Sequence, residues 1–148
     1  MSDGIEFEET LADVQSEIIS VSLEYCGPSV SDIYVYASTE NGSMFFDPFF
    51  VVEGHVVSRG NLAGVDTSIP RQRALVKYGN AQLMRLWDAG VAAGRPVPSQ
   101  LKLHYSVVKG SLDGEYEYGP QYSNSETLSV HDISSAWKAE IQRSLTVG

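Results

Sequence analysis

The stretch SLDGEYEYG, residues 111–119, alternates acidic and aromatic side chains in a pattern that could carry out a specific task. In a β-strand, successive side chains point to opposite faces of the sheet. Asp113, Glu115 and Glu117 would then form a row of three carboxylates on one face, with Tyr116 and Tyr118 on the other. Such a row could bind a metal ion, attract a basic partner, or be the solvated edge of a sheet.

Residues that support catalysis or metal binding are present, but not at the spacing that this chemistry requires. No two of the three histidines, His55, His104 and His131, stand at metal-ligand spacing. The HExxH, paired CxxC, calcium-loop, Walker, GxGxxG and GxSxG patterns are all absent. Cys26 ends an apolar helical stripe, a position typical of a buried, inert thiol. We therefore predict no catalytic residue, no cofactor and no metal.

Tyrosines are concentrated in the segments that we expect to be strands. DIYVYAS places Tyr34 and Tyr36 on one strand face and leads into an acidic glycine turn that begins at Glu40. Tyrosine is enriched in interfaces because it adds a large contact area at a low entropic cost. We predict that these three residues bind a partner together with Asp113, Glu115 and Glu117. The alternative is a sheet face packed beneath a helix, with the phenol oxygens at its rim.

The charge is strongly acidic and unevenly distributed. The 148 residues carry a net charge of −9, which makes nucleic acid a poor direct partner, because a phosphate backbone needs Lys and Arg to replace its counterions. Residues 1–66 hold 12 acidic residues against one base, Arg59, for a net charge of −11, whereas residues 67–148 have a net charge of +2. Such a field attracts a basic protein. The alternative is an acidic surface that only maintains solubility.

Length and composition indicate one globular domain, residues 1–148, with an ordinary hydrophobic content of 43%. The single cysteine, Cys26, cannot form an internal disulfide. The opening MSDGIEFEE lacks the basic and apolar regions of a signal peptide, and no segment approaches the roughly 18 apolar residues of a membrane span. We expect a cytoplasmic protein without a membrane partner. The oligomeric state is left open, with a monomer as one option for the free protein.

Hydrophobic periodicity predicts three helices. Apolar residues recur every three or four positions from Phe7 to Tyr25 and every four from Ile133 to Leu145, and a looser apolar stripe runs from Leu75 to Val91. Gly and Pro end the first two stripes, and Ser123 with Glu126 has the spacing of a capping box before the third. The predicted helices therefore cover residues 6–25, 70–93 and 127–145.

Period-two alternation predicts five strands between these helices. Asn41-Gly42 favours a tight hairpin, and Pro48 marks a bulge or an edge because it cannot donate to a ladder. The expected strands are residues 32–38, 44–52, 55–59, 101–108 and 114–118. Because the strands come in hairpins, we predict an α+β fold. A mostly antiparallel sheet, a three-strand meander plus a hairpin, is covered by the N-terminal, central and C-terminal helices.

The arrangement of these segments resembles a family of bacterial proteins. IYVYAS before an acidic glycine turn, a helix containing LMRLWDAG, and then LKLHYSVVKGSLDGEYEYG are similar to the YezG/EsaG-like immunity (antitoxin) proteins. The resemblance covers roughly residues 5–143. The chain departs from the family pattern at Pro48 and in the central helix region, at Gly79, Gly90, Pro96 and Pro98.

The resemblance implies a non-enzymatic protein that binds and neutralises a cognate secreted toxin inside the producing cell. The toxin in such systems is commonly a nuclease. A nuclease presents positive charge to its substrate, so an acidic protein can occupy that surface, with Asp113, Glu115 and Glu117 imitating phosphates. Two alternatives stay open: a small ligand-binding or enzymatic domain with a pocket between sheet and helices, and a chaperone or subunit that binds a secreted protein without inhibiting it.

Overall fold

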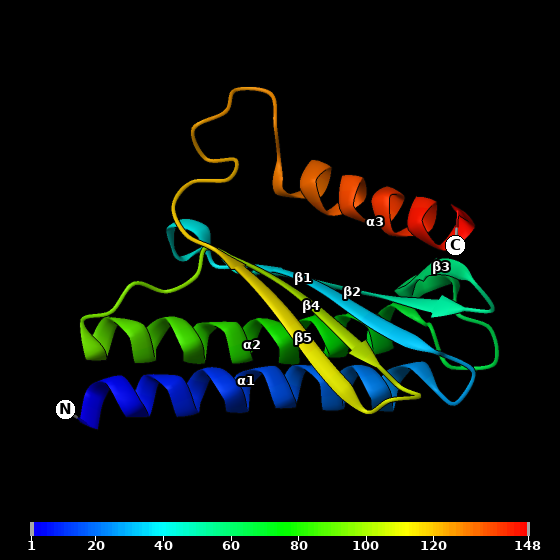
Figure 1. The fold of residues 1–148 in the computed structure, drawn as a ribbon, viewed down its shortest axis with the longest axis horizontal. Helices are drawn as coiled ribbons and strands as arrows, with labels where there is room; N and C mark the ends of the chain where they lie inside the picture. Colours follow the sequence, from blue (N-terminus) through cyan, green and yellow to red (C-terminus); the bar gives the residue numbers. More distant parts are fainter. Residues whose placement is uncertain (1, 148) are drawn as a thin grey trace.

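A computed structural model describes residues 2–147 of the chain. Met1 and Gly148, the two ends of the predicted domain of residues 1–148, lie outside the described residues. The fold is α+β, as predicted, with an antiparallel sheet between two layers of helices (Figure 1). The elements in chain order are α1 (Ser2–Cys26), β1 (Asp32–Ser38), η1 (Glu40–Gly42), β2 (Phe45–Val52), β3 (His55–Ser58), η2 (Arg59–Asn61), α2 (Ile69–Ala93), β4 (Gln100–Ser106), β5 (Ser111–Glu117) and α3 (Val130–Val147).

The sheet has the strand order β3-β2-β1-β4-β5, and every neighbouring pair is antiparallel. This confirms the predicted meander of three strands and the later hairpin. The hairpin joins the meander through β4, which pairs with β1 so that His104 lies opposite Tyr34. β3 pairs with β2 only from Phe49 onward, so Pro48 lies where β2 has no neighbour on that side. The missing N–H of the proline is tolerated in such a local edge position.

The connection between β1 and β2 differs from the tight hairpin that we predicted. Asn41 and Gly42 do adopt positive φ angles, 58° and 74°. They belong to the short helix η1, however, and the connection spans residues 39–44 rather than two residues. The longer connection brings Glu40 into a buried position.

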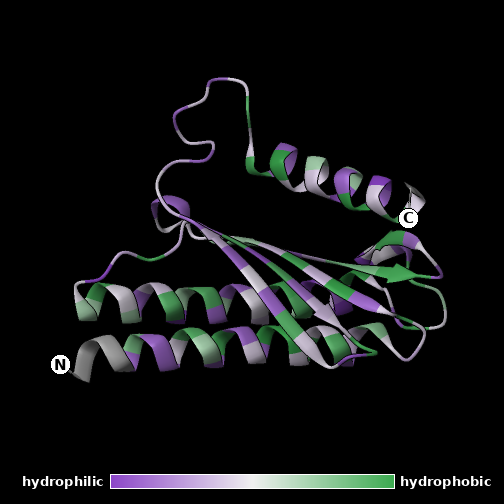
Figure 2. Ribbon diagram, in the orientation of Figure 1, coloured by the Kyte–Doolittle hydropathy of each residue, from purple (hydrophilic) through white to green (hydrophobic). Residues whose placement is uncertain are grey.

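α1 and α2 lie side by side on one face of the sheet and enclose the larger hydrophobic core (Figures 1 and 2). Val14 and Ile18 on α1 are fully buried, as predicted, while Leu11 is only partly buried. Gly79 allows α2 to approach β2 closely, because a Cβ atom there would lie 2.3 Å from the Phe46 ring. None of the helices within residues 2–147 is long and apolar enough to cross a lipid bilayer.

α3 covers the opposite face of the sheet, over β2 and β3, and builds a second, smaller core (Figure 1). Trp137 is buried there as predicted, and Ile141 is partly buried. The capping box lies at the helix start, but not at Ser123 and Glu126. Ser129 Oγ accepts a hydrogen bond from the Asp132 N–H, and the Asp132 carboxylate accepts one from the Ser129 N–H. Both pairs have the same spacing, and the pair that caps the helix lies six residues after the predicted one.

Candidate interaction surface

β5 is an open edge strand. It is the last strand in the sheet order and pairs with β4 on one side only. All seven of its residues are exposed. Asp113, Glu115 and Glu117 alternate along it, so they lie on one face of the sheet as a row of three carboxylates, called here the acidic row. The structure thus brings together three of the six residues that the sequence analysis predicted to bind a partner.

The two faces of β5 have different surroundings. On the face toward α1, the Tyr116 hydroxyl donates a hydrogen bond to Gln15 Oε1 at 2.9 Å, and its ring lies over Gly114. The acidic row lies on the other face, the one that α3 covers further along the sheet. The predicted alternation of acids and tyrosines between faces is confirmed for Tyr116. Tyr118 follows the end of β5 and is exposed.

The basic side chains opposite the acidic row have contacts elsewhere. Lys102 and His104 on β4 lie directly opposite Glu115 and Asp113. Lys102 Nζ lies 5.3 Å from the centre of the Trp137 ring, however. His104 Nε2 lies 2.7 Å from Asp32 Oδ1. Within residues 2–147, the three carboxylates of the row have no ion pair and accept no hydrogen bond.

His104 is also held in place by an aromatic contact. Its ring stacks on Tyr34 with the ring centres 4.2 Å apart. The imidazole is therefore fixed against β1 by both its ring face and its Nε2 atom. It is not free to turn toward Asp113, and this accounts for the absence of a cross-strand pair.

Tyr34 and Tyr36 were predicted to bind a partner, and their burial contradicts this. They are only 9% and 0% exposed. Both pack beneath α3, where Tyr34 meets the edge of the Trp137 ring and stacks on Phe49. The Tyr36 hydroxyl donates to Gln100 Oε1, and burial raises the pKa of this phenol. The alternative that the sequence left open, a sheet face packed under a helix, describes these two residues correctly.

Glu40 was also predicted to bind a partner, and it too is buried, at 4% exposed. Its carboxylate accepts hydrogen bonds from the backbone N–H groups of Gln121, Tyr122 and Ser123, at 2.7, 3.3 and 2.7 Å. Burial raises the pKa of Glu40, but the hydrogen bonds from Ser123, Gln121 and Tyr122 outweigh it and lower the pKa overall. Glu40 thus fastens the segment after β5 to the end of β1.

A second buried carboxylate, Asp47 on β2, was not singled out in the sequence analysis. Its Oδ1 pairs with Arg59 at 2.9 Å, and its Oδ2 pairs with Lys138 at 2.9 Å and accepts a hydrogen bond from Ser134 Oγ at 2.6 Å. Lys138 and Ser134 belong to α3, so this network anchors that helix to the sheet. An acid inside the apolar run FFDPFFVV was the available signal, because a buried charge needs partners.

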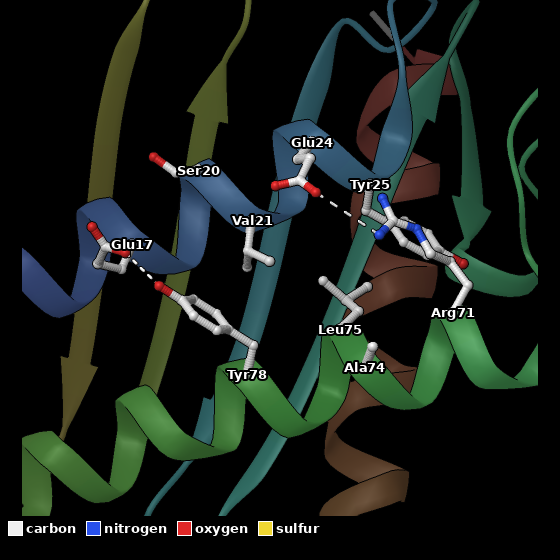
Figure 3. Close-up of a pocket in the computed structure, with 9 residues that line it drawn as sticks. All are labelled: Glu17, Ser20, Val21, Glu24, Tyr25, Arg71, Ala74, Leu75 and Tyr78. Carbon is white, nitrogen blue, oxygen red and sulfur yellow. Dashed lines mark hydrogen bonds and ion pairs between the residues drawn. The ribbon is translucent and has the colours of Figure 1, made fainter.

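The outer side of the α1–α2 pair carries a groove of about 360 Å³ (Figure 3). Its polar groups satisfy one another across the groove. The Tyr78 hydroxyl donates to the Glu17 carboxylate, which raises the pKa of Tyr78, and Arg71 lies 3.9 Å from Glu24. These contacts join the two helices. The groove therefore acts as a seam between the helices.

Nothing among the described residues groups three or more His, Cys, Asp or Glu side chains in a way that could hold a metal ion. Cys26 is buried, and burial raises the pKa of its thiol to about 11. Since the thiolate is the nucleophilic form, this cysteine stays protonated and unreactive near neutral pH.

Comparison of the sequence with protein-family models and with curated proteins finds no match.

Proposed function

We propose that this protein is an immunity protein that binds and neutralises a basic secreted toxin, a nuclease domain being the expected class, inside the cell that makes the toxin. The observation that carries the proposal is the acidic row: three carboxylates on an exposed edge strand, where the basic side chains opposite, Lys102 and His104, have contacts elsewhere. The net charge of −9 and the resemblance to YezG/EsaG-like proteins point the same way.

The acidic row suits a surface that normally binds nucleic acid. Alternate residues of a strand are about 7 Å apart, so the row presents three regularly spaced negative charges. A nuclease must place Lys and Arg side chains along its substrate channel to contact phosphates. Docking the row against that channel would pair opposite charges and exclude the substrate. Because Asp113, Glu115 and Glu117 give up no existing partner on binding, their charge is available for the interface.

The proposal is tested by reversing the charge of the row. We expect the triple variant D113K/E115K/E117K to bind a cognate basic toxin domain at least 100-fold more weakly, because like charges then face each other across the interface. Wild-type association should also slow as salt rises, since ions screen the field. The measurement is surface plasmon resonance at low and high salt, with circular dichroism to verify the fold.

A charge-matched control separates docking from a general effect of net charge. Glu9, Asp88 and Glu140 are exposed acids on α1, α2 and α3. The variant E9K/D88K/E140K changes the net charge by the same amount but leaves the row intact, so it should slow association only modestly. If both variants lose the same affinity, the row is not the docking site. If neither variant loses affinity, the acids are only a solvated sheet edge.

A further inference from the structure

β5 presents backbone groups along its open edge. The Glu117 carbonyl accepts a hydrogen bond from the Ser99 N–H at 2.9 Å, so the backbone groups of Glu117 face β4. At the other end of the hairpin, the Val107 N–H donates to the Ser31 carbonyl on the β1 side, so Ser106, the residue before it, faces β5. Backbone direction alternates along a strand, and with the observed register both contacts give the same result. The residues of β5 whose N–H and C=O groups face away from β4 are Leu112, Gly114 and Tyr116.

The two edges of the sheet differ in how far a further strand could reach them. β3, at the opposite edge, has only four residues, and its Val56 N–H donates to Gln142 Oε1 of α3 at 2.7 Å. β5 has seven residues, all exposed, and no strand within residues 2–147 lies beyond it (Figure 1). An open edge of this length is a template on which another strand can pair.

A second copy of this chain is a poor occupant of the edge. Antiparallel pairing of two β5 strands through their outward groups would set Leu112, Gly114 and Tyr116 opposite one another, and the odd-numbered residues likewise. Carboxylates of the acidic row in one copy would then lie directly opposite those in the other, and like charges in that position destabilise a sheet. The acidic row therefore disfavours self-pairing and favours a basic strand.

We propose that β5 accepts an extended segment of a partner protein, with alternating basic and apolar residues, as a sixth strand of this five-stranded sheet. The inference rests on the proposed function for the identity of the partner, because the segment would belong to the toxin. Its basic residues would face Asp113 and Glu115, at positions between the hydrogen-bonded pairs, where opposite side chains approach most closely. Its apolar residues would lie on the face toward α1, beside the exposed Leu112 and Tyr116. Main-chain hydrogen bonds would supply affinity, and the alternation would supply specificity.

The probe is the synthetic peptide KVKVKVK, labelled with fluorescein at its N-terminus and amidated at its C-terminus, and binding is measured by fluorescence anisotropy. Its matched control carries N-methyl groups on the three valines, the residues that would hydrogen-bond to β5. The control keeps the charge and the pattern but lacks these donors, so it should bind about tenfold more weakly. Equal affinities would overturn the proposal, because charge alone would then account for binding.

Amide hydrogen exchange of the wild type shows which groups the peptide covers. Saturating peptide should slow exchange at Leu112, Gly114 and Tyr116, whose N–H groups face outward, and leave Asp113 and Glu115, which face β4, unchanged. Binding without slower exchange at the three outward amides would overturn the proposal. Absence of binding at millimolar peptide would do the same.

A variant of the protein tests the same backbone groups. L112P removes one outward N–H, and an edge strand tolerates proline at such a position, which circular dichroism would verify. L112A loses the same side chain but keeps the N–H, so its affinity for the peptide should lie between those of wild type and L112P. Equal losses in the two variants would overturn the role of the backbone.

The peptide also separates this inference from the proposed function. Failure of the peptide tests, while D113K/E115K/E117K still weakens toxin binding, would overturn strand addition and leave the proposed function intact. Peptide binding as expected, with an unchanged toxin affinity in that variant, would support strand addition and overturn the proposed function.

Discussion

Glu40 and Asp47 stand close to the ends of β1 and β2, while the acidic row stands on β5, and the two sets of carboxylates have opposite surroundings. The first two are buried and bound by backbone N–H groups, by a hydroxyl, or by cations. The three of the row are exposed, and among the described residues they have no ion pair. The comparison shows that acid content alone does not define an interaction surface. The acids that hold this fold together are the ones that a helix or a connecting segment covers.

The largest effect on stability should follow from removing the charge of Asp47. D47N leaves Arg59 and Lys138 without their anion, and we expect it to lower the free energy of unfolding by about 2–3 kcal/mol. This is less than for a fully buried pair because both cations are partly exposed. Urea denaturation measures the change. D113N, the same substitution in the acidic row, is the control. Equal stabilities of D47N and wild type would contradict the expected difference between the buried carboxylates and the acidic row.

Glu40 should have a smaller, pH-dependent effect. We expect E40Q to lower the free energy of unfolding by about 1–2 kcal/mol at pH 7, because the charged acceptor of three N–H groups is lost. The folded-state pKa lies below the ordinary value of about 4.5, so the charge stabilises the fold above that value. The contribution is lost as the pH falls through the lowered pKa.

The measurement for Glu40 is therefore the difference in unfolding free energy between wild type and E40Q from pH 7 to pH 3. The difference should shrink steadily over the acid part of this range. E115Q in the acidic row serves as the matched control, because this exposed carboxylate accepts no hydrogen bond within residues 2–147. A difference that stays constant with pH would mean that E40Q acts through packing and not through charge.

Neutralising the acidic row should have the smallest effect. The variant D113N/E115Q/E117Q removes three charges that have no partner in the part of the chain that the structure describes, so we expect the melting temperature to change by less than about 2 °C. Differential scanning calorimetry checks this. A large loss of stability would show that the row has a structural role and would remove the contrast with Asp47 and Glu40.

Much of the fold could be predicted from local patterns in the sequence. The spacing of Val14, Ile18 and Trp137 indicated which helix faces are buried, and alternation in DIYVYAS and LKLHYSVV located β1 and β4. The acidic row was also predictable, because the faces of a strand follow from its period of two. These features depend only on residues that are near one another in the chain.

The misassigned site residues depend on distant contacts. Glu40 binds backbone N–H groups 81 to 83 residues further along the chain, and no local sequence pattern indicates these contacts. Tyr34 and Tyr36 lie on a sheet face that α3 covers only because the chain crosses the sheet after β5. The alternation predicts that these tyrosines share a face of the sheet. It does not predict that a helix covers that face.

The route of the chain after β5 bears on how easily α3 detaches from the sheet. Residues 118–129 carry the chain from β5, at one edge of the sheet, to α3, which packs toward the other edge. α3 rests on the smaller core and is tied down by Asp47, while the larger core lies wholly on the other side of the sheet. We therefore expect the helix to open as a separate cooperative unit while the rest of the protein stays folded. Its amides would exchange with solvent sooner than those of β1, and each detachment would briefly bare the aromatic face around Tyr34 and Phe49.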